Sequence, residues 1–503
     1  MRASRNLRAT SCAVFLVLAS ACSDSDRLTE PLPEPTELPE PLSAEEISER
    51  GLGAWRKYYM AHTEYEASLA MSATADVLTG NCCWVRFENQ EPRTPFNNDP
   101  LSTNSGITVR PWIGYYSALE DANAVLHSIL NRGVELSSED EERTLILMAR
   151  LTKAAAHTQL ALIFDQAFII DEDSVKAIEA DSTIELELQP YTAVAAAARK
   201  YWDDVISMTD GATWEIQGDA YELMGLQGSS GTALSHEFIN RLAHTMAARL
   251  LAYTPRTVAE GTAVPWGAVL NHAQNGVTDI SGTGPGVMLE YGADWYSFVS
   301  LWLPVKDRFR VDHRIINMMA PDVPPRFTGD EASMAEGVSA DARYGTDIVY
   351  TGDVVGDPLR GVYMQSTHFH ARWENISLAA PEATRMGQPI PFILPAENNL
   401  LIAEAILRTG GNAGTAADLI NLTRVDRGGL PPATAADGPS TLMDYLLYER
   451  YVELMGTSGT ELLDARRFDD TQPGTWRHLP VPGRELERLG IPMYTFGGVG
   501  NEM

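Results

Sequence analysis

The chain has 503 residues, of which 44% are apolar and 21% charged, so it can bury the core of one large folded body or two ordinary domains. Its formal net charge at pH 7 is −30. Because an acidic surface repels phosphate groups, this charge argues against nucleic acid as a partner and against electrostatic binding to anionic lipid head groups.

Residues 1–21 have the composition of a secretory signal peptide. Three arginines and no acidic residue precede the apolar run 13–18, which is too short to cross a bilayer as a helix, since roughly 20 residues are needed. The sequence Ala19-Ser20-Ala21-Cys22 resembles a bacterial lipobox, in which the cysteine is acylated and becomes the new N-terminus. We therefore expect Cys22 to carry a lipid. Ordinary cleavage after Ala21 is the alternative, because such small-residue sites also serve secreted proteins.

Residues 22–42 are expected to form a tether. The stretch 23–26 resembles the serine- and aspartate-rich signals that send some lipoproteins to the outer face of the cell. The prolines from Pro31 to Pro41 remove helical hydrogen bonds and favour an extended, semi-rigid chain. The folded body should therefore begin near Ser43 and run to residue 503.

Helical periodicity is the main pattern in this body. Ser43, with acidic residues at positions 45 and 46, predicts the N-cap of a first helix that continues to about Leu78. A helix over 111–131 and another one, capped at Ser137-Ser138-Glu139 and ending near Phe164, should form an antiparallel pair. The same periodicity predicts helices over 190–208, 233–254, 265–275, 396–409, 412–425 and 440–455.

Small residues favour close packing between these helices. Alanines at 154–156 and 195–198 allow helix axes to approach closely, and Gly410-Gly411-Asn412 marks a short stop and restart between two helices. We predict a mainly α fold of antiparallel helix pairs, similar to tetratricopeptide packing, although no strict sequence repeat is present.

Residues 276–395 differ from the rest of the body. Glycine, proline, aspartate and aromatic residues dominate, helical periodicity is absent, and short β-prone runs such as 348–350 occur. The sequence predicts a loop-rich insertion, and loops held on a rigid scaffold are where binding groups usually lie.

The folded body contains only two cysteines, the adjacent Cys82 and Cys83. This spacing does not match a redox or metal motif. The pair can close a vicinal disulfide in an oxidising compartment or remain as two thiols, and the sequence leaves both states open.

The sequence predicts neither a catalytic nor a metal site. A serine hydrolase elbow, a phosphate-binding loop and a zinc-binding helix motif are absent, and no spacing singles out one pair among the 68 acidic residues for glycoside hydrolysis. His368-Phe369-His370 would place two imidazoles on one face of a strand, with Glu374 close by, but no fourth ligand is indicated. We therefore expect a binding protein without a cofactor and not an enzyme, with a surface hydrolase as a rival.

Several segments together resemble the SusD/RagB family of surface lipoproteins. Residues 150–165 and 237–249 are similar to two long helices of that family, and residues 396–405 and 421–430 are closer still. The remaining matches follow in the order of the family: Glu449-Arg450, Glu453-Leu454, Asp464, Arg466-Arg467, Pro480-Val481-Pro482 and Glu485. The sequence departs at Thr460-Glu461-Leu462, where the family usually has His-Arg-Trp, which points to a rearranged local salt bridge.

The resemblance implies a lipid-anchored protein of the outer membrane, facing the cell exterior. Such a protein captures an oligosaccharide or another nutrient and passes it to a TonB-dependent transporter of the SusC type, without a cofactor. The alternative is an envelope lipoprotein that binds a peptide or a protein through the helical groove.

The charged residues of the matching helices fit ion pairs better than catalysis. Glu404 lies four residues before an arginine, one helical turn away. Glu449 lies one turn before Glu453, and this acidic pair needs a cationic partner, for which we expect Arg466 or Arg467.

A glycan site needs exposed aromatic rings, which pack on the C–H faces of sugars, beside polar groups that bind hydroxyls. Similar surfaces in the family are built from loops of the first two thirds. The candidate contact residues here are Trp84, Arg86, Asn89, Tyr291, Trp295, Tyr296 and Trp302. The alternative for each ring is a place in the core, where tryptophan is often largely buried.

Overall fold

The structure is a computed structural model of the chain. It describes residues 42–503 except for 65–66, 81–92, 103–104, 227–229, 279–286, 290–294, 296–298, 300–302, 304, 330–334, 357–363, 375–389 and 458. Cys22, Cys82 and Cys83 therefore lie outside the described residues.

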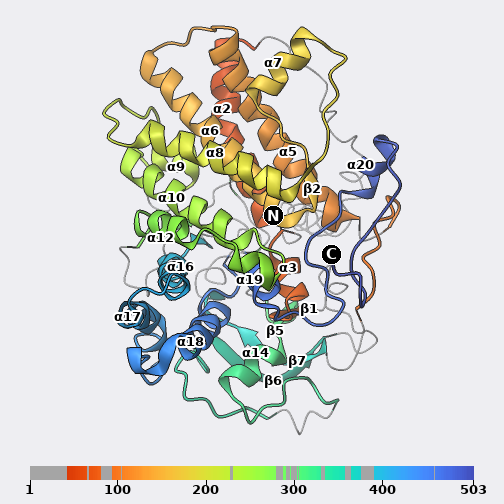
Figure 1. Ribbon diagram of the computed structural model, residues 1–503, viewed down its shortest axis with the longest axis vertical. Coiled ribbons are helices and arrows are strands. Elements are labelled where there is room, and N and C mark those ends of the chain that lie inside the picture. Colours follow the sequence, from red (N-terminus) through yellow and green to blue (C-terminus); the bar gives the residue numbers. More distant parts are fainter. Residues whose placement is uncertain are drawn as a thin grey trace, which may run out of the picture.

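Helices dominate the described chain, which confirms the prediction of a mainly α fold (Figure 1). The first half contains α2 (Ala44–Thr63), α3 (Leu69–Thr74), α5 (Gly106–Leu126), a π-helical turn (His127–Asn131), α6 (Glu139–Ile163), α7 (Glu172–Ala180), α8 (Tyr191–Thr209), α9 (Ala220–Met224) and α10 (His236–Tyr253). The second half contains α11 (Val258–Thr262), α12 (Trp266–Gln274), α14 (His313–Met319), α16 (Pro395–Arg408), α17 (Ala413–Arg424), α18 (Gly438–Glu453), α19 (Thr460–Phe468) and α20 (Gly483–Arg488).

The first helix begins where it was predicted but ends earlier. The Ser43 hydroxyl accepts a hydrogen bond from the Glu46 N–H (3.3 Å), and the Glu46 carboxylate accepts one from the Ser43 N–H (2.8 Å), which is a complete capping box. However, α2 ends at Thr63, where the next residue has an extended backbone, and α3 follows as a separate short helix. The prediction of one helix to Leu78 is therefore wrong, and Leu78 begins a strand.

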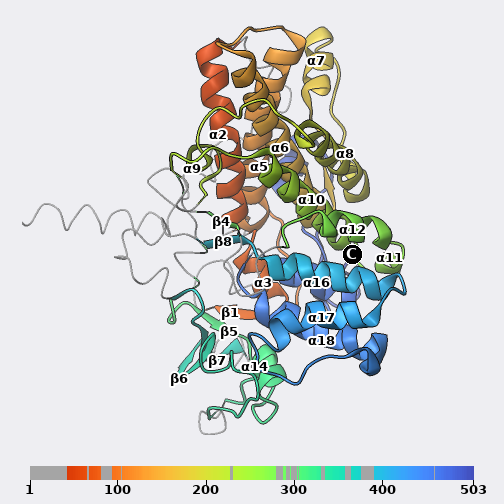
Figure 2. The same cartoon turned by 90° about the vertical axis from the view of Figure 1, so that its left-hand side faces the viewer.

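The helices form one continuous stack. α5 packs on α2, α6 on α5 and α8 on α6, and the stack continues through α10, α12, α16, α17 and α18, each in contact with the one before it. Figure 2 shows α2, α5 and α6 upright at one end of the molecule, with α12, α16, α17 and α18 as successive layers toward the other end. This arrangement is the predicted scaffold of helix pairs.

Small side chains are buried on α6 and α8. Ala154–Ala156 on α6 and Ala195 and Ala198 on α8 are buried, and the two helices pack against each other. The indole N–H of Trp202 donates to the Thr158 hydroxyl across the same contact, at 2.8 Å. Ala196 is exposed and Ala197 is half-buried, so only part of the predicted alanine run on α8 lies in the core, and its effect on helix spacing stays a prediction.

The described part of the insertion contains short strands as well as loops. The strands in the described part of the chain are β1 (Leu78–Gly80), β2 (Gln166–Ala167), β3 (Gln189–Pro190), β4 (Val287–Leu289), β5 (Phe309–Val311), β6 (Ile348–Val355), β7 (Ser366–His370) and β8 (Ile390–Ile393). They form antiparallel pairs, β1 with β5, β2 with β3, β4 with β8 and β6 with β7. The β-prone run 348–350 begins β6, as predicted. None of the described helices is long and apolar enough to span a membrane.

Buried ion pairs hold the insertion against the C-terminal helices. Arg343 Nη1 lies 2.7 Å from the Glu449 carboxylate and 3.2 Å from that of Glu453. Glu453 also pairs with Arg372 at 2.7 Å and with Arg427 at 3.1 Å. The acidic pair on α18 therefore has cationic partners, but they come from the insertion and from the turn that follows α17.

The prediction that Arg466 or Arg467 would pair with these two acids is wrong. Arg466 donates to backbone carbonyls. Arg467 pairs with Glu404 at 2.5 Å and with Asp464 at 2.7 Å. Glu404 also pairs with Arg408, one turn later on α16, at 3.3 Å, and this contact was predicted.

Candidate functional site

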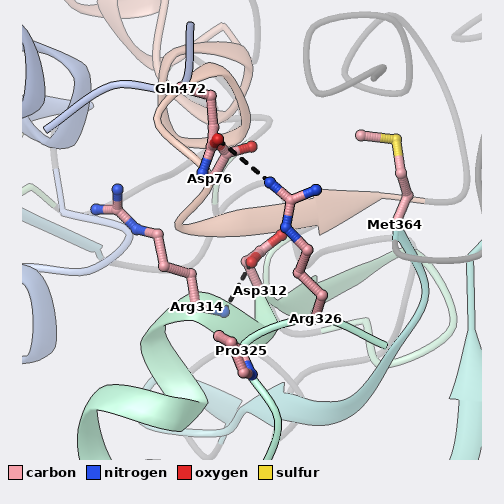
Figure 3. A pocket seen from close by; sticks show the side chains of 7 residues that line it. All are labelled: Asp76, Asp312, Arg314, Pro325, Arg326, Met364 and Gln472. Atoms are coloured by element: carbon pink, nitrogen blue, oxygen red, sulfur yellow. Dashed lines mark hydrogen bonds between the residues drawn. The ribbon is translucent and has the colours of Figure 1, made fainter. Parts of the chain in front are cut away.

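A small cavity lies where four separate parts of the chain meet. It has a volume of about 80 Å³ and is lined by Asp76, Asp312, Arg314, Pro325, Arg326, Met364 and Gln472 (Figure 3). Small-molecule pockets usually have about 300–1,000 Å³. This cavity therefore suits a few water molecules or one polar end of a larger ligand.

Strand pairing brings the two acidic residues of the cavity together. β1 pairs with β5, and the Asp312 N–H donates to the Val77 carbonyl at 2.9 Å. Asp76 directly precedes this pairing, with a left-handed backbone (φ +54°) that a non-glycine residue seldom adopts. Asp312 is the N-cap of α14, where its carboxylate accepts a hydrogen bond from the Arg314 N–H at 2.9 Å.

The basic side chains around the cavity are bound to acidic or amide groups. Arg93 lies 2.5 Å from the Asp76 carboxylate. Arg314 pairs with Asp470 at 3.1 Å, and in Figure 3 its side chain extends away from the rest of the group. Arg326 Nη2 donates to the Gln472 side-chain carbonyl at 3.2 Å. The cavity thus contains both hydrogen-bond donors and acceptors.

Among the residues that line the cavity, Asp312 has a strongly raised pKa. Burial raises the pKa of its carboxyl to about 7, and the negative charge of Asp76 raises that pKa further, while the hydrogen bond from the Arg314 N–H opposes the rise. A carboxyl that changes its protonation near neutral pH can act as a donor or as an acceptor toward a ligand. A perturbed carboxyl in a cavity also marks a candidate functional site, although ion-pair networks produce similar shifts.

Most of the predicted ligand-contact residues lie outside the described residues. These are Trp84, Arg86, Asn89, Tyr291, Tyr296 and Trp302. The structure therefore does not relate them to the cavity, and their role stays a prediction.

Trp295 lies in the core. Its side chain is 3% exposed, and its indole packs edge-on against the Tyr59 ring, with the two ring centroids 5.8 Å apart. Gly225, at φ +69°, lies so close below the indole that a Cβ atom there would come within 2.9 Å of it. A ligand contact would need an exposed ring face, which Trp295 does not have. Trp295 instead occupies the core position that was the alternative for each of these rings.

His368 and His370 lie on the strand β7, and both are buried. His368 Nε2 is 2.7 Å from the Tyr344 hydroxyl. Burial lowers the pKa of both His368 and His370 to about 3, so both are neutral at pH 7. Within the described ranges, no three His, Cys, Asp or Glu side chains are grouped closely enough to hold a metal ion.

The cavity residues were not found by sequence reasoning. Asp312 carried a usable local signal, because an aspartate before an apolar helical run is a typical N-cap. Asp76, Arg326 and Gln472 carried none, since they meet only through the pairing of β1 with β5 and the return of the C-terminal segment.

This protein is similar to known proteins in its three-dimensional structure but not detectably in its sequence. No protein-family model matches the sequence, and no curated protein is significantly similar to it. A SusD homolog from Bacteroides thetaiotaomicron has a TM-score of 0.59 at 13% identity, over 91% of this chain and 97% of its own. A SusD-like carbohydrate binding protein from Bacteroides fragilis has a TM-score of 0.57 at 13% identity, over 84% and 86%. A SusD superfamily protein from Bacteroides vulgatus has a TM-score of 0.56 at 14% identity, over 86% and 90%. At these identities the likeness shows the fold, and it extends over most of each chain.

Proposed function

We propose that this chain, which has the SusD-like fold, is a cell-surface lipoprotein that binds an oligosaccharide or another nutrient and delivers it to a SusC-like TonB-dependent transporter. The observation that supports this most is the extent of the likeness, which reaches 84% or more of this chain in all three structures. One of those proteins is described as carbohydrate binding. A nutrient-binding role is thus the function that the fold supports best.

The membrane attachment in this proposal rests on the N-terminal sequence. Residues 1–21 are the signal peptide, Cys22 is acylated, residues 22–42 form the tether, and residues 43–503 form the binding domain. Radiolabelled palmitate should enter the wild-type protein and not Cys22→Ser. External protease should digest the intact protein on whole cells, and resistance to it would contradict an outward-facing location.

The ligand in this proposal binds to loops beside the helical scaffold. The residues that we propose as contacts are Trp84, Arg86, Asn89, Tyr291, Tyr296 and Trp302. Aromatic rings next to an arginine and an asparagine are the combination that sugar rings and their hydroxyls require.

We further infer that the protein binds its ligand without chemical turnover. A surface hydrolase would need an acid with a raised pKa, and Asp312 is the described carboxyl that best meets this need. Wild type and Asp312→Asn should both leave a bound oligosaccharide intact. Reducing-end release by the wild type that is lost in the variant would instead establish a hydrolase.

A glycan array with the non-acylated Cys22→Ser protein, combined with affinity capture of partners from outer membranes, tests the main proposal. We expect binding to one class of oligosaccharide and co-purification of a TonB-dependent transporter. A failure to bind any glycan or nutrient, together with a partner that is not a transporter, would favour an envelope protein that binds peptides or proteins.

A further inference from the structure

Two histidines on neighbouring helices face each other away from the cavity. His244 lies on α10 and His272 on α12, and these helices pack directly on each other. Their Nδ1 atoms are 3.0 Å apart, and their ring centroids are 5.1 Å apart. His272 is buried and His244 is half-buried, so solvent reaches the pair from the side of His244.

This separation matches the spacing of two ligands on one metal ion. Zinc binds imidazole nitrogen at about 2.0–2.1 Å, so two nitrogens at right-angled to tetrahedral positions lie roughly 2.9–3.4 Å apart. The same separation also suits an Nδ1–H···Nδ1 hydrogen bond between neutral rings. A metal ion would replace that hydrogen bond, and the two rings would turn so that both Nδ1 lone pairs point at the ion.

The surroundings keep the two rings in the form that binds metals. Burial lowers the pKa of His272 to about 4 and also lowers the pKa of His244, so both imidazoles are neutral at pH 7. The carboxylates of Asp203, on α8, and of Asp210, directly after α8, favour a positive charge on His244. Asp203 has the same effect on His272. The positive charge of Arg199 lowers the pKa of His272.

We propose that His244 and His272 bind one divalent transition-metal ion of the zinc, nickel or copper class through their Nδ1 atoms, with water completing the coordination. Imidazole nitrogen is a preferred ligand for these ions, whereas calcium and magnesium prefer oxygen. The ring that donates the hydrogen bond in the free protein moves its proton to Nε2 when the metal binds, so no proton is released. The described residues supply two protein ligands, and this favours modest affinity.

Metal titration of histidine variants tests this site, with protein purified without a polyhistidine tag. Zn²⁺ affinity is measured by competition with a chromophoric chelator for wild type, His244→Gln and His272→Gln. His236→Gln is the matched control, because it removes another half-buried histidine from the same helix. Sites elsewhere, including the cysteines, contribute equally to all four proteins, so the differences between them report this pair.

We expect one Zn²⁺ site of the wild type to weaken by about tenfold or more in His244→Gln and His272→Gln but not in His236→Gln, since loss of an outer-sphere partner alone typically costs about 10–100-fold. Electron paramagnetic resonance of bound Cu²⁺ should show coupling to two nitrogens in the wild type and lose it in both variants. Unchanged Zn²⁺ affinity in His244→Gln, or Cu²⁺ without nitrogen coupling in the wild type, would overturn the proposal. If near-ultraviolet circular dichroism shows that His272→Gln is unfolded, the more exposed His244→Gln decides alone. None of these results depends on glycan binding.

Discussion

Arg343 in the insertion and Glu449 on α18 are 106 residues apart in the sequence, yet 2.7 Å separates the guanidinium from the carboxylate. Both side chains are almost completely buried. Burial alone would lower the pKa of Arg343, but the hydrogen bonds and negative charges of Asp341 and Glu449 hold that pKa above its ordinary value. The insertion is thus fixed to the C-terminal helices by charges that water does not screen.

Replacing this arginine should destabilise the protein strongly. We expect Arg343→Met to lower the free energy of unfolding by about 3–5 kcal/mol, because Glu449 and Asp341 would remain buried without their cation. Urea titration followed by far-ultraviolet circular dichroism measures this change. Arg143→Met is the control, since the pair of Arg143 with Glu139 is exposed and such pairs contribute about 0–1 kcal/mol. Equal losses in the two variants would contradict the prediction.

Asp312 should make stability depend on pH in a definite direction. Its folded-state pKa of about 7 lies above the ordinary aspartate value of about 3.9, so the folded state binds more protons between these two pH values. The free energy of unfolding therefore contains a contribution that is full below about pH 4 and is lost as pH rises through 7. Asp312→Asn removes this titration and keeps a side chain that can cap α14.

We expect the wild type to lose stability relative to Asp312→Asn as the pH rises from 4.5 to 7.5, by at most about 1.4 kcal/mol for each pH unit. Urea unfolding of both proteins at the two pH values measures this difference. A difference that stays constant with pH would show that Asp312 does not titrate in this range.

Two arginines donate hydrogen bonds to the backbone carbonyls at the C-terminal end of α6. Arg256 and Arg466 each donate to the Leu162 carbonyl, at 2.8 and 2.9 Å, and Arg256 also donates to the Ala161 carbonyl at 2.5 Å. The last carbonyls of a helix have no partner within the helix, and a buried carbonyl without one costs about 1–3 kcal/mol.

Because both arginines serve the same oxygen, their replacements should not be additive. After Arg256→Met or Arg466→Met alone, Leu162 keeps one donor, whereas the double variant leaves it none. We expect the double variant to lose more stability than the sum of the single ones, by about 0.5–3 kcal/mol. A thermodynamic cycle of urea unfolding measures this coupling, and simple additivity would contradict it.

The scaffold was predictable because its signals are local. The N-caps Ser43, Ser138 and Asn412 each accept a hydrogen bond from the backbone within three residues, so the sequence placed those helix starts correctly. The early end of α2 had no such signal. Apolar residues continue at helical spacing beyond Thr63, and the break shows only in the tertiary structure.

The partners of the buried charges were not predictable, because these contacts join residues that are far apart in the sequence. Glu449 was expected to pair with an arginine close in sequence, whereas its partner comes from the insertion. Asp76 and Asp312 likewise meet only because β1 pairs with β5. A capping pattern can mark one of these residues, as it does for Asp312, but no local pattern shows which distant residue it will meet.

We expect different roles for two tryptophans that the sequence grouped together. Trp295 is buried against Tyr59 and Gly225, so Trp295→Ala should lower the free energy of unfolding by about 3–5 kcal/mol. Trp84 is proposed as a ligand contact, so Trp84→Ala should weaken binding of the glycan identified on the array by about tenfold or more and leave the melting temperature unchanged. Calorimetric titration and thermal unfolding of both variants distinguish the two roles. If Trp84→Ala destabilises the fold as much as Trp295→Ala does, then Trp84 is also a core residue and the proposed contact set loses its first aromatic ring.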